Sequence, residues 1–250
     1  MDKEEARRKA LKETKKELTG SVDREKLVVK AVKYLDGLNQ SIADEVEVIG
    51  DWYSLHFPEL VEEIGAGEEL LKILDRGLER SDLDSFQEMA ENSNGMPLPE
   101  KDVEVLEEVV TSANNKIELR DQVESYIEET VKEEMPNLSK LLGSMLTAKL
   151  LGLVGGLEDL AEKPASTVQM LGAEKALFRY LSGEGTPPKH GVLYEHSFVN
   201  SLPEDSRGKM ARFMANKASI AARLDFYGEK DKGSELRDEA RQKFEKLRES

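Results

Sequence analysis

The sequence predicts an all-α protein in which an antiparallel coiled-coil hairpin is followed by a compact helical domain. Residues 28–49 and 103–117 place side chains of an apolar seam three and four positions apart, and apolar positions continue to residue 131, which is typical of long helices with one buried face. Between them, residues 81–99 are rich in Asn, Ser, Gly and Pro and read as a connector. Two long helices joined in this way are expected to fold back on each other.

Composition limits the classes of function. The chain has 250 residues, no cysteine and a net charge of -15. This length suits one large domain or two modest ones. The absence of cysteine excludes disulfides, thiolate metal sites and a cysteine nucleophile. The most apolar run, residues 141–160, is interrupted by Lys149 and by glycines, so it predicts buried helices and no membrane partner.

The hairpin is expected to span residues 23–135, after a charged N-terminal arm at residues 1–22. Asp23 is a suitable N-cap, and Met135 precedes the proline that ends the second helix. The first apolar seam consists of Val28, Val32, Leu35, Asn39, Ile42, Val46 and Ile49. Asn39 either fixes the register against a partner helix or faces solvent.

Residues 51–60 follow the first helix and end it at Pro58. His56 lies among aromatic residues and is interpreted as a packed corner residue rather than a ligand. The second seam begins after Pro99 and consists of Val103, Leu106, Val110, Ala113, Ile117, Leu119, Val123, Ile127 and Val131. An exposed seam favours pairing with a second copy, whereas an ordinary bundle would turn every seam inward.

Positive charge is concentrated in one part of this acidic chain. Residues 1–162 contain 20 Lys and Arg against 38 Asp and Glu, and residues 163–223 contain 9 against 5. Within the second segment, Lys175 and Arg179 lie four residues apart on one face of a short helix that Gly172 opens. Such a pair indicates either an anion-binding face or an ordinary solvated face.

A second helix of this segment begins at Pro203. Its polar stripe consists of Lys209, Arg212, Asn216, Ser219 and Arg223. The tail, residues 229–250, forms an amphipathic C-terminal helix that either docks on the domain or reaches a partner; its apolar face is Leu236, Ala240, Phe244 and Leu247. The three histidines lie far apart, and the acidic residues follow helix faces, so no enzyme activity, metal site or cofactor is expected.

Several motifs of the chain resemble the Nop family. They are DWYSLHFPEL at residues 51–60, GAEKALFR at 172–179, TPPKHG at 186–191, ANK at 215–217 and AARLD at 221–225. The resemblance extends from about residue 23 to about residue 227. It implies that residues 136–228 form a Nop RNA- and protein-binding domain and that the coiled coil forms a homodimer.

The resemblance further implies a ribonucleoprotein scaffold. Its partners would be a box C/D-type guide RNA and a kink-turn-binding ribosomal-type protein. The residues implied in RNA binding are Glu174, Lys175, Arg179, Lys189, His190, His196, Lys209, Arg212, Asn216 and Lys217. Neutral rings beside cations suit a flipped-out base, although His196 fits equally well as a hydrogen-bonded residue within the domain.

Two features depart from the family pattern. A charged arm of about twenty residues precedes the coiled coil, where archaeal members carry a domain that binds the methyltransferase fibrillarin, and this leaves fibrillarin recruitment in doubt. The tail lacks the lysine-rich extension of the eukaryotic relatives, which favours a cytoplasmic archaeal protein. The alternatives are a structural dimerising coiled-coil protein and a spliceosomal-like paralogue without a methylation role.

Overall fold

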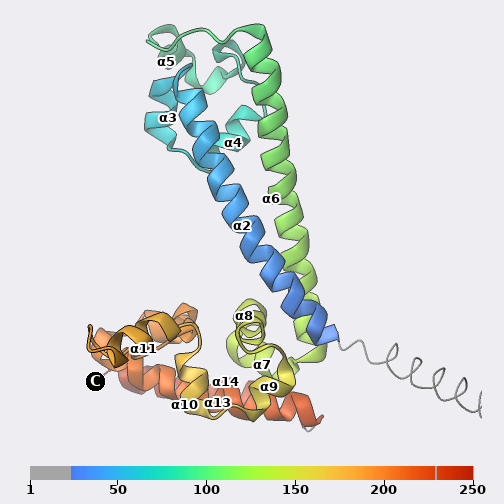
Figure 1. Ribbon diagram of the computed structural model, residues 1–250, viewed down its shortest axis with the longest axis vertical. Coiled ribbons are helices and arrows are strands. Elements are labelled where there is room, and N and C mark those ends of the chain that lie inside the picture. Colours follow the sequence, from blue (N-terminus) through green and yellow to red (C-terminus); the bar gives the residue numbers. More distant parts are fainter. Residues whose placement is uncertain (1–23, 229, 250) are drawn as a thin grey trace, which may run out of the picture. The chain divides into compact units, whose positions relative to one another are not determined.

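The structure, a computed structural model, describes residues 24–228 and 230–249 (Figure 1). These residues form α-helices and short 3-10 helices and contain no strand, which confirms the all-α prediction. The predicted N-terminal arm, residues 1–22, lies outside the described residues. Among the helices described, none combines the length and the apolarity that a membrane span needs.

The chain divides into two compact units. One is residues 34–125, and the other combines residues 24–33 with residues 126–228 and 230–249. The long helices α2 (Arg24–Ser54) and α6 (Glu100–Glu134) therefore contribute to both units. Their ends, which the sequence assigned to the hairpin, are grouped with the helical domain. Gly152 explains part of this, because a Cβ there would lie only 3.3 Å from Val32 Cγ1.

In the unit 34–125, α2 and α6 run side by side in opposite directions (Figure 1). Their core is formed by Leu38, Ile42, Val46, Ile49 and Tyr53 of α2 and Leu106, Val110 and Ala113 of α6. Leu38, and not Asn39, occupies the seam, and Asn39 is exposed. The register role considered for Asn39 is therefore wrong within this hairpin.

Short helices close the wide end of the hairpin: α3 (Pro58–Ile64), α4 (Glu68–Leu74), η1 (Arg80–Asp82), η2 (Asp84–Phe86) and α5 (Gln87–Glu91). Of these, η2 and α5 lie within the predicted connector, and η1 begins one residue before it. Arg80 holds this region together, because its Nη2 donates to the carbonyl oxygens of His56 and Gly95, each at 2.5 Å. His56 is buried with Nδ1 2.9 Å from the Met96 carbonyl oxygen, as expected of a packed corner residue.

The helical domain is built around α13 (Glu204–Tyr227). The elements before it are α7 (Pro136–Leu142), α8 (Ser144–Val154), α9 (Leu157–Glu162), α10 (Ala165–Met170), α11 (Glu174–Leu181), η3 (Val192–Glu195) and α12 (Ser197–Asn200). Helices α7, α9, α10 and α12 all pack against α13. The buried side of α13 is mostly Ala and Met, whose small or flexible side chains allow several helices to approach closely.

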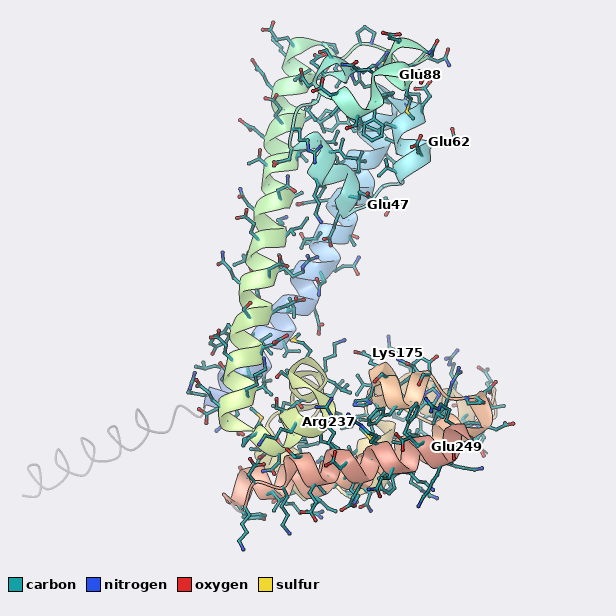
Figure 2. All side chains as sticks on the ribbon, turned by 180° about the vertical axis from the view of Figure 1, so that it is seen from behind. Glu47, Glu62, Glu88, Lys175, Arg237 and Glu249 are labelled. Atoms are coloured by element: carbon teal, nitrogen blue, oxygen red, sulfur yellow. The ribbon has the colours of Figure 1, made fainter. Side chains whose placement is uncertain are left out.

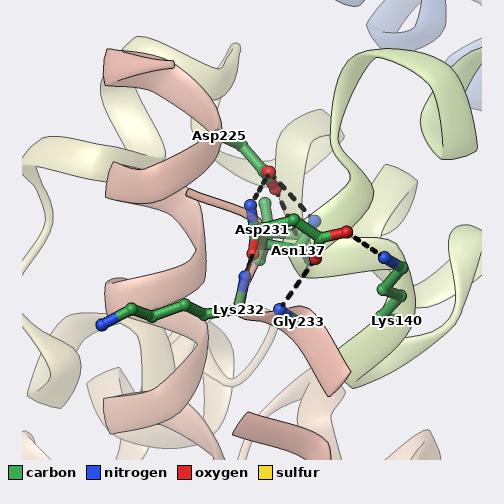
Figure 3. Close-up of polar contacts among 7 residues, drawn as sticks. Asn137, Lys140, Asp225, Asp231, Lys232 and Gly233 are labelled. Atoms are coloured by element: carbon green, nitrogen blue, oxygen red, sulfur yellow. Dashed lines mark hydrogen bonds and ion pairs between the residues drawn. The ribbon is translucent and has the colours of Figure 1, made fainter. Parts of the chain in front are cut away.

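The C-terminal helix α14 (Gly233–Arg248) docks on α7 and α13. Figure 3 shows the polar contacts that hold its start. Asp225 accepts hydrogen bonds from the backbone N–H groups of Asn137 and Leu138, each at 2.9 Å, and so caps α7. Asn137 Oδ1 accepts from the Lys232 N–H at 2.6 Å. One asparagine therefore links the end of α13, the start of α7 and the start of α14.

Candidate nucleic-acid interface

Helix α11 carries the first pair of predicted RNA-binding cations. Gly172 precedes it at a φ of +79°, where a side chain would be strained, and its N–H donates to Glu174 Oε1 at 2.9 Å. Glu174 therefore closes the turn that starts the helix. Lys175 and Arg179 are exposed and have no carboxylate partner among the residues described; Figure 2 labels Lys175 on this helix.

Helix α11 also exposes large apolar side chains. Phe178 is 68% exposed and Leu181 is 69% exposed, and no residue of this helix is buried. Large apolar side chains at this exposure, next to unpaired cations, are typical of a surface that a partner covers. The helix thus presents both a cationic and an apolar surface.

The loop after α11 brings Lys189 and His190 to α13. Gln169 Nε2 donates to the Lys189 carbonyl oxygen at 2.8 Å, and a Cβ on Gly208 would lie 3.2 Å from Lys189 Cβ. His190 stacks on Tyr194, with ring centroids 4.7 Å apart. Burial, followed by the charge of Arg207, lowers the pKa of His190. The ring is therefore neutral near pH 7 and suited to stacking.

A groove of about 660 Å³ lies along α13 and collects most of the other predicted cations. Its charged lining residues are Lys189, Lys209, Arg212, Lys217 and Lys243. Phe213, Asn216 and Gln169 also line it. The predicted set is therefore only partly brought together. Five of its members do not line this groove: Glu174, Lys175, Arg179, His190 and His196. Lys243 of α14 is a lining residue that the sequence did not single out.

His196 has a different environment from His190. Its Nδ1 accepts a hydrogen bond from the Phe198 N–H at 3.1 Å and thereby caps α12. Burial is the main cause that lowers the pKa of His196, which keeps this nitrogen free to accept. The ring also packs edge-on against Phe198, with centroids 4.8 Å apart. These contacts favour the interpretation of His196 as a residue internal to the domain over that of a base-stacking residue.

The predicted polar stripe of α13 is also interrupted. Ser219 is buried, and Arg223 Nε donates to the Ala161 carbonyl oxygen at 3.0 Å. Lys217 forms an ion pair with Glu239 of α14. Within residues 24–228 and 230–249, Lys209, Arg212 and Asn216 are the members of this stripe that are exposed and form no side-chain hydrogen bond or ion pair. In the part of the chain that the structure describes, no group of three acidic or histidine side chains converges as a metal site would require.

A hairpin of two long helices, together with a helical domain that carries a cationic groove, defines the class as an all-α protein with a positively charged surface groove. The chain belongs to the Nop family, because the family model described as "snoRNA binding domain, fibrillarin" matches residues 34–246. This confirms the family that the sequence motifs indicated.

Individual relatives agree with this assignment. A NOP5 family protein of Methanocaldococcus jannaschii is 36% identical over 220 residues, which cover 82% of this chain and 53% of that protein. Nucleolar protein 56 of Caenorhabditis elegans is 34% identical over 226 residues, covering 81% and 46%. The chain thus spans about half the length of these relatives.

A solved structure supports the same fold. A chain of the fibrillarin/Nop5p complex is 28% identical, with a TM-score of 0.57. The match covers 98% of this chain and 78% of that one.

Proposed function

We propose that this protein binds a box C/D-type guide RNA together with a kink-turn-binding ribosomal-type protein, as a ribonucleoprotein scaffold without a catalytic step. The observation that carries the proposal is the composition of the exposed surface of α11. Lys175 and Arg179 supply unpaired positive charge, and Phe178 and Leu181 supply apolar area on the same short helix. Phosphates suit the first pair and a protein surface suits the second.

The energetics favour two partners at once. Two like charges four residues apart are mildly unfavourable until an anion lies across them. Covering Phe178 and Leu181 would contribute roughly 1.5 to 3 kcal/mol each. A helix with no buried residue of its own gains most from such contacts, so we infer that α11 is ordered most firmly when RNA and protein are both bound.

The hairpin supplies the proposed homodimer contact. Val48 of α2 and Val105 of α6 are more than half exposed, at 59% and 51%, although both belong to long helices with a buried seam. Apolar side chains on the outer face of a hairpin suit a second copy. Fibrillarin is named in the description of the family model and in the name of the solved complex. We do not include it among the proposed partners, because neither the surface of α11 nor the groove indicates a fibrillarin-binding site.

We place this activity in an archaeal cytoplasm. The relative from Methanocaldococcus jannaschii is archaeal, and the similarity covers 82% of this chain. The description of the matching family model supports an RNA-binding role, since it names snoRNA binding. Under the alternative role of a spliceosomal-like paralogue, the same protein surface would bind a different RNA.

The test is a gel-shift titration of a kink-turn RNA, with and without its kink-turn-binding protein, at two salt concentrations. We expect a supershift only with the partner, and we expect it to weaken as salt increases. The double variant Lys175→Ala/Arg179→Ala should bind at least about tenfold more weakly at unchanged thermal stability, because it removes two charge-assisted phosphate contacts.

The matched control is Lys72→Ala/Arg76→Ala, an exposed lysine and arginine also four residues apart but in the hairpin. It should bind RNA as the wild type does. If the α11 variant instead loses stability while its binding per folded molecule is unchanged, the site assignment is wrong. If folded, dimeric protein gives no supershift at micromolar concentration, the structural dimerising role replaces the RNA role.

A further inference from the structure

Several cationic side chains that line the groove along α13 have no carboxylate partner among the described residues of their own domain. Lys217 is paired with Glu239, and Lys189 lies 3.5 Å from Glu204 in an exposed pair of little strength. Lys209, Arg212 and Lys243 form no ion pair with any residue that the structure describes. Three unpaired cations in one groove repel each other unless an anion is bound between them.

Lys243 is unusual among them because it comes from α14. Its neighbour Phe244 stacks on Phe198, with centroids 5.0 Å apart, and Ala240 and Leu247 are buried. The helix is also held at its start through Asn137 and Lys232. The backbone at Lys243 is therefore fixed by packing, so binding through this side chain orders little beyond the side chain itself.

Lys217 has a different role in the same groove. Its side chain is only 15% exposed, it pairs with Glu239, and its Nζ lies 5.4 Å from the centre of the Phe213 ring. A mostly buried, paired ammonium has little charge left for an external anion, and removing it would leave Glu239 without its partner. The ion pair joins α13 to α14 and so holds Lys243 over the groove.

We propose that the groove between α13 and α14 binds backbone phosphates of the RNA, with Lys243 as a phosphate-contacting residue and Lys217 as a positioning residue. The inference rests on the proposed function and adds a second contact surface to α11. The lining favours phosphate chemistry, since Lys209, Arg212 and Lys243 only donate hydrogen bonds. Phe213 supplies an apolar surface for a sugar or base beside the phosphates.

The experiment measures RNA affinity of the full chain, in complex with the kink-turn-binding protein, over a series of salt concentrations. Lys243→Ala should weaken binding about threefold to tenfold and lower the salt slope by about one unit, at unchanged thermal stability. Lys217→Ala should lower the melting temperature, and its salt slope per folded molecule should stay at the wild-type value. The matched control is Lys232→Ala, whose side chain extends away from the contacts drawn in Figure 3.

Three outcomes would overturn the inference. If Lys175→Ala/Arg179→Ala abolishes the complex while Lys243→Ala binds with wild-type affinity and slope, the groove is not a phosphate site and the proposed function stands. If the wild type binds no RNA at all, both fail. Free inorganic phosphate and polyglutamate serve as competitors. If polyglutamate binds the wild type more tightly than Lys243→Ala, while the two proteins bind the RNA with equal affinity, the groove belongs to an acidic protein segment and not to the RNA.

Discussion

His190 and His196 lie six residues apart in the chain, and each ring has a separate task. His190 stacks on Tyr194, above which Arg207 lies with its guanidinium carbon 5.5 Å from the ring centre. His196 Nδ1 instead accepts a hydrogen bond from the Phe198 N–H in the first turn of α12. A ring used as a helix cap cannot leave its place to stack on a base without breaking that cap.

The two rings therefore predict opposite phenotypes. His196→Ala should destabilise the protein by about 0.5 to 2 kcal/mol through the lost cap, with RNA affinity per folded molecule unchanged. His190→Ala should keep the stability near that of the wild type and weaken RNA binding by roughly 1 to 3 kcal/mol, the value of one stacked base. Thermal unfolding and gel-shift titration of both variants measure the two effects. An exchange of phenotypes would assign base stacking to His196.

Single residues also show where sequence reasoning reaches its limit. The positively charged and polar residues of the groove were predictable as a stripe because Lys209, Arg212 and Asn216 repeat at helical spacing on one element. Lys243 was not, since it lies in a separate helix whose apolar periodicity reports only which side is buried. The pairing of Lys217 with Glu239 was equally hidden, because it depends on where α14 docks.

At the scale of elements, the helices were predictable and their exact faces were less so. Between Leu35 and Ile42, the buried seam of α2 can continue through either position 38 or position 39, since both give one step of three residues and one of four. The leucine takes the buried place because it brings apolar area without an amide to satisfy. The composition of residues 81–99 predicts a connector, but composition does not reveal that tertiary hydrogen bonds fold part of it into short helices.

One of those bonds makes the stability of the hairpin tip depend on pH. Glu59 in the first turn of α3 accepts from the Ser93 hydroxyl at 2.6 Å and the Asn94 N–H at 2.9 Å. These hydrogen bonds, with the one from the Asn94 backbone first, lower the pKa of Glu59 to about 2 from an ordinary value of 4.5. The folded state thus favours the carboxylate, and the unfolded state binds the proton first.

The lowered pKa of Glu59 determines how its contribution to stability changes with pH. The stabilisation by Glu59 is fully present above pH 4.5 and is lost as the pH falls from there toward about 2. Glu59→Gln should lower the melting temperature at pH 7 and lose less than the wild type on acidification, as thermal scans from pH 7 to pH 3 would record. Glu62→Gln is the matched control, an exposed glutamate of the same helix (Figure 2), and should follow the wild type. A parallel decline in Glu59→Gln would mean that other carboxylates set the acid limit.

At the scale of the whole molecule, charge is divided between the two units. Residues 34–125 contain 6 Lys and Arg against 24 Asp and Glu, a net charge of -18. The groove and α11 belong to the other unit. We therefore expect the proposed RNA to be repelled by the hairpin and attracted by the cations of the helical domain, which would restrict where it binds.

The same division predicts that salt acts in opposite directions on the two proposed assemblies. Two hairpins of net charge -18 repel each other, and salt screens this repulsion over a Debye length that falls from about 10 Å at 0.1 M to about 3 Å at 1 M. Apolar contacts such as those of Val48 and Val105 do not weaken with salt in this way. Raising the salt concentration should therefore strengthen the homodimer and weaken RNA binding. Sedimentation equilibrium and gel-shift titration of the same preparation at low and high salt measure both constants. A dimer that dissociates as salt increases would show that ion pairs between the copies, rather than apolar side chains, hold the hairpins together.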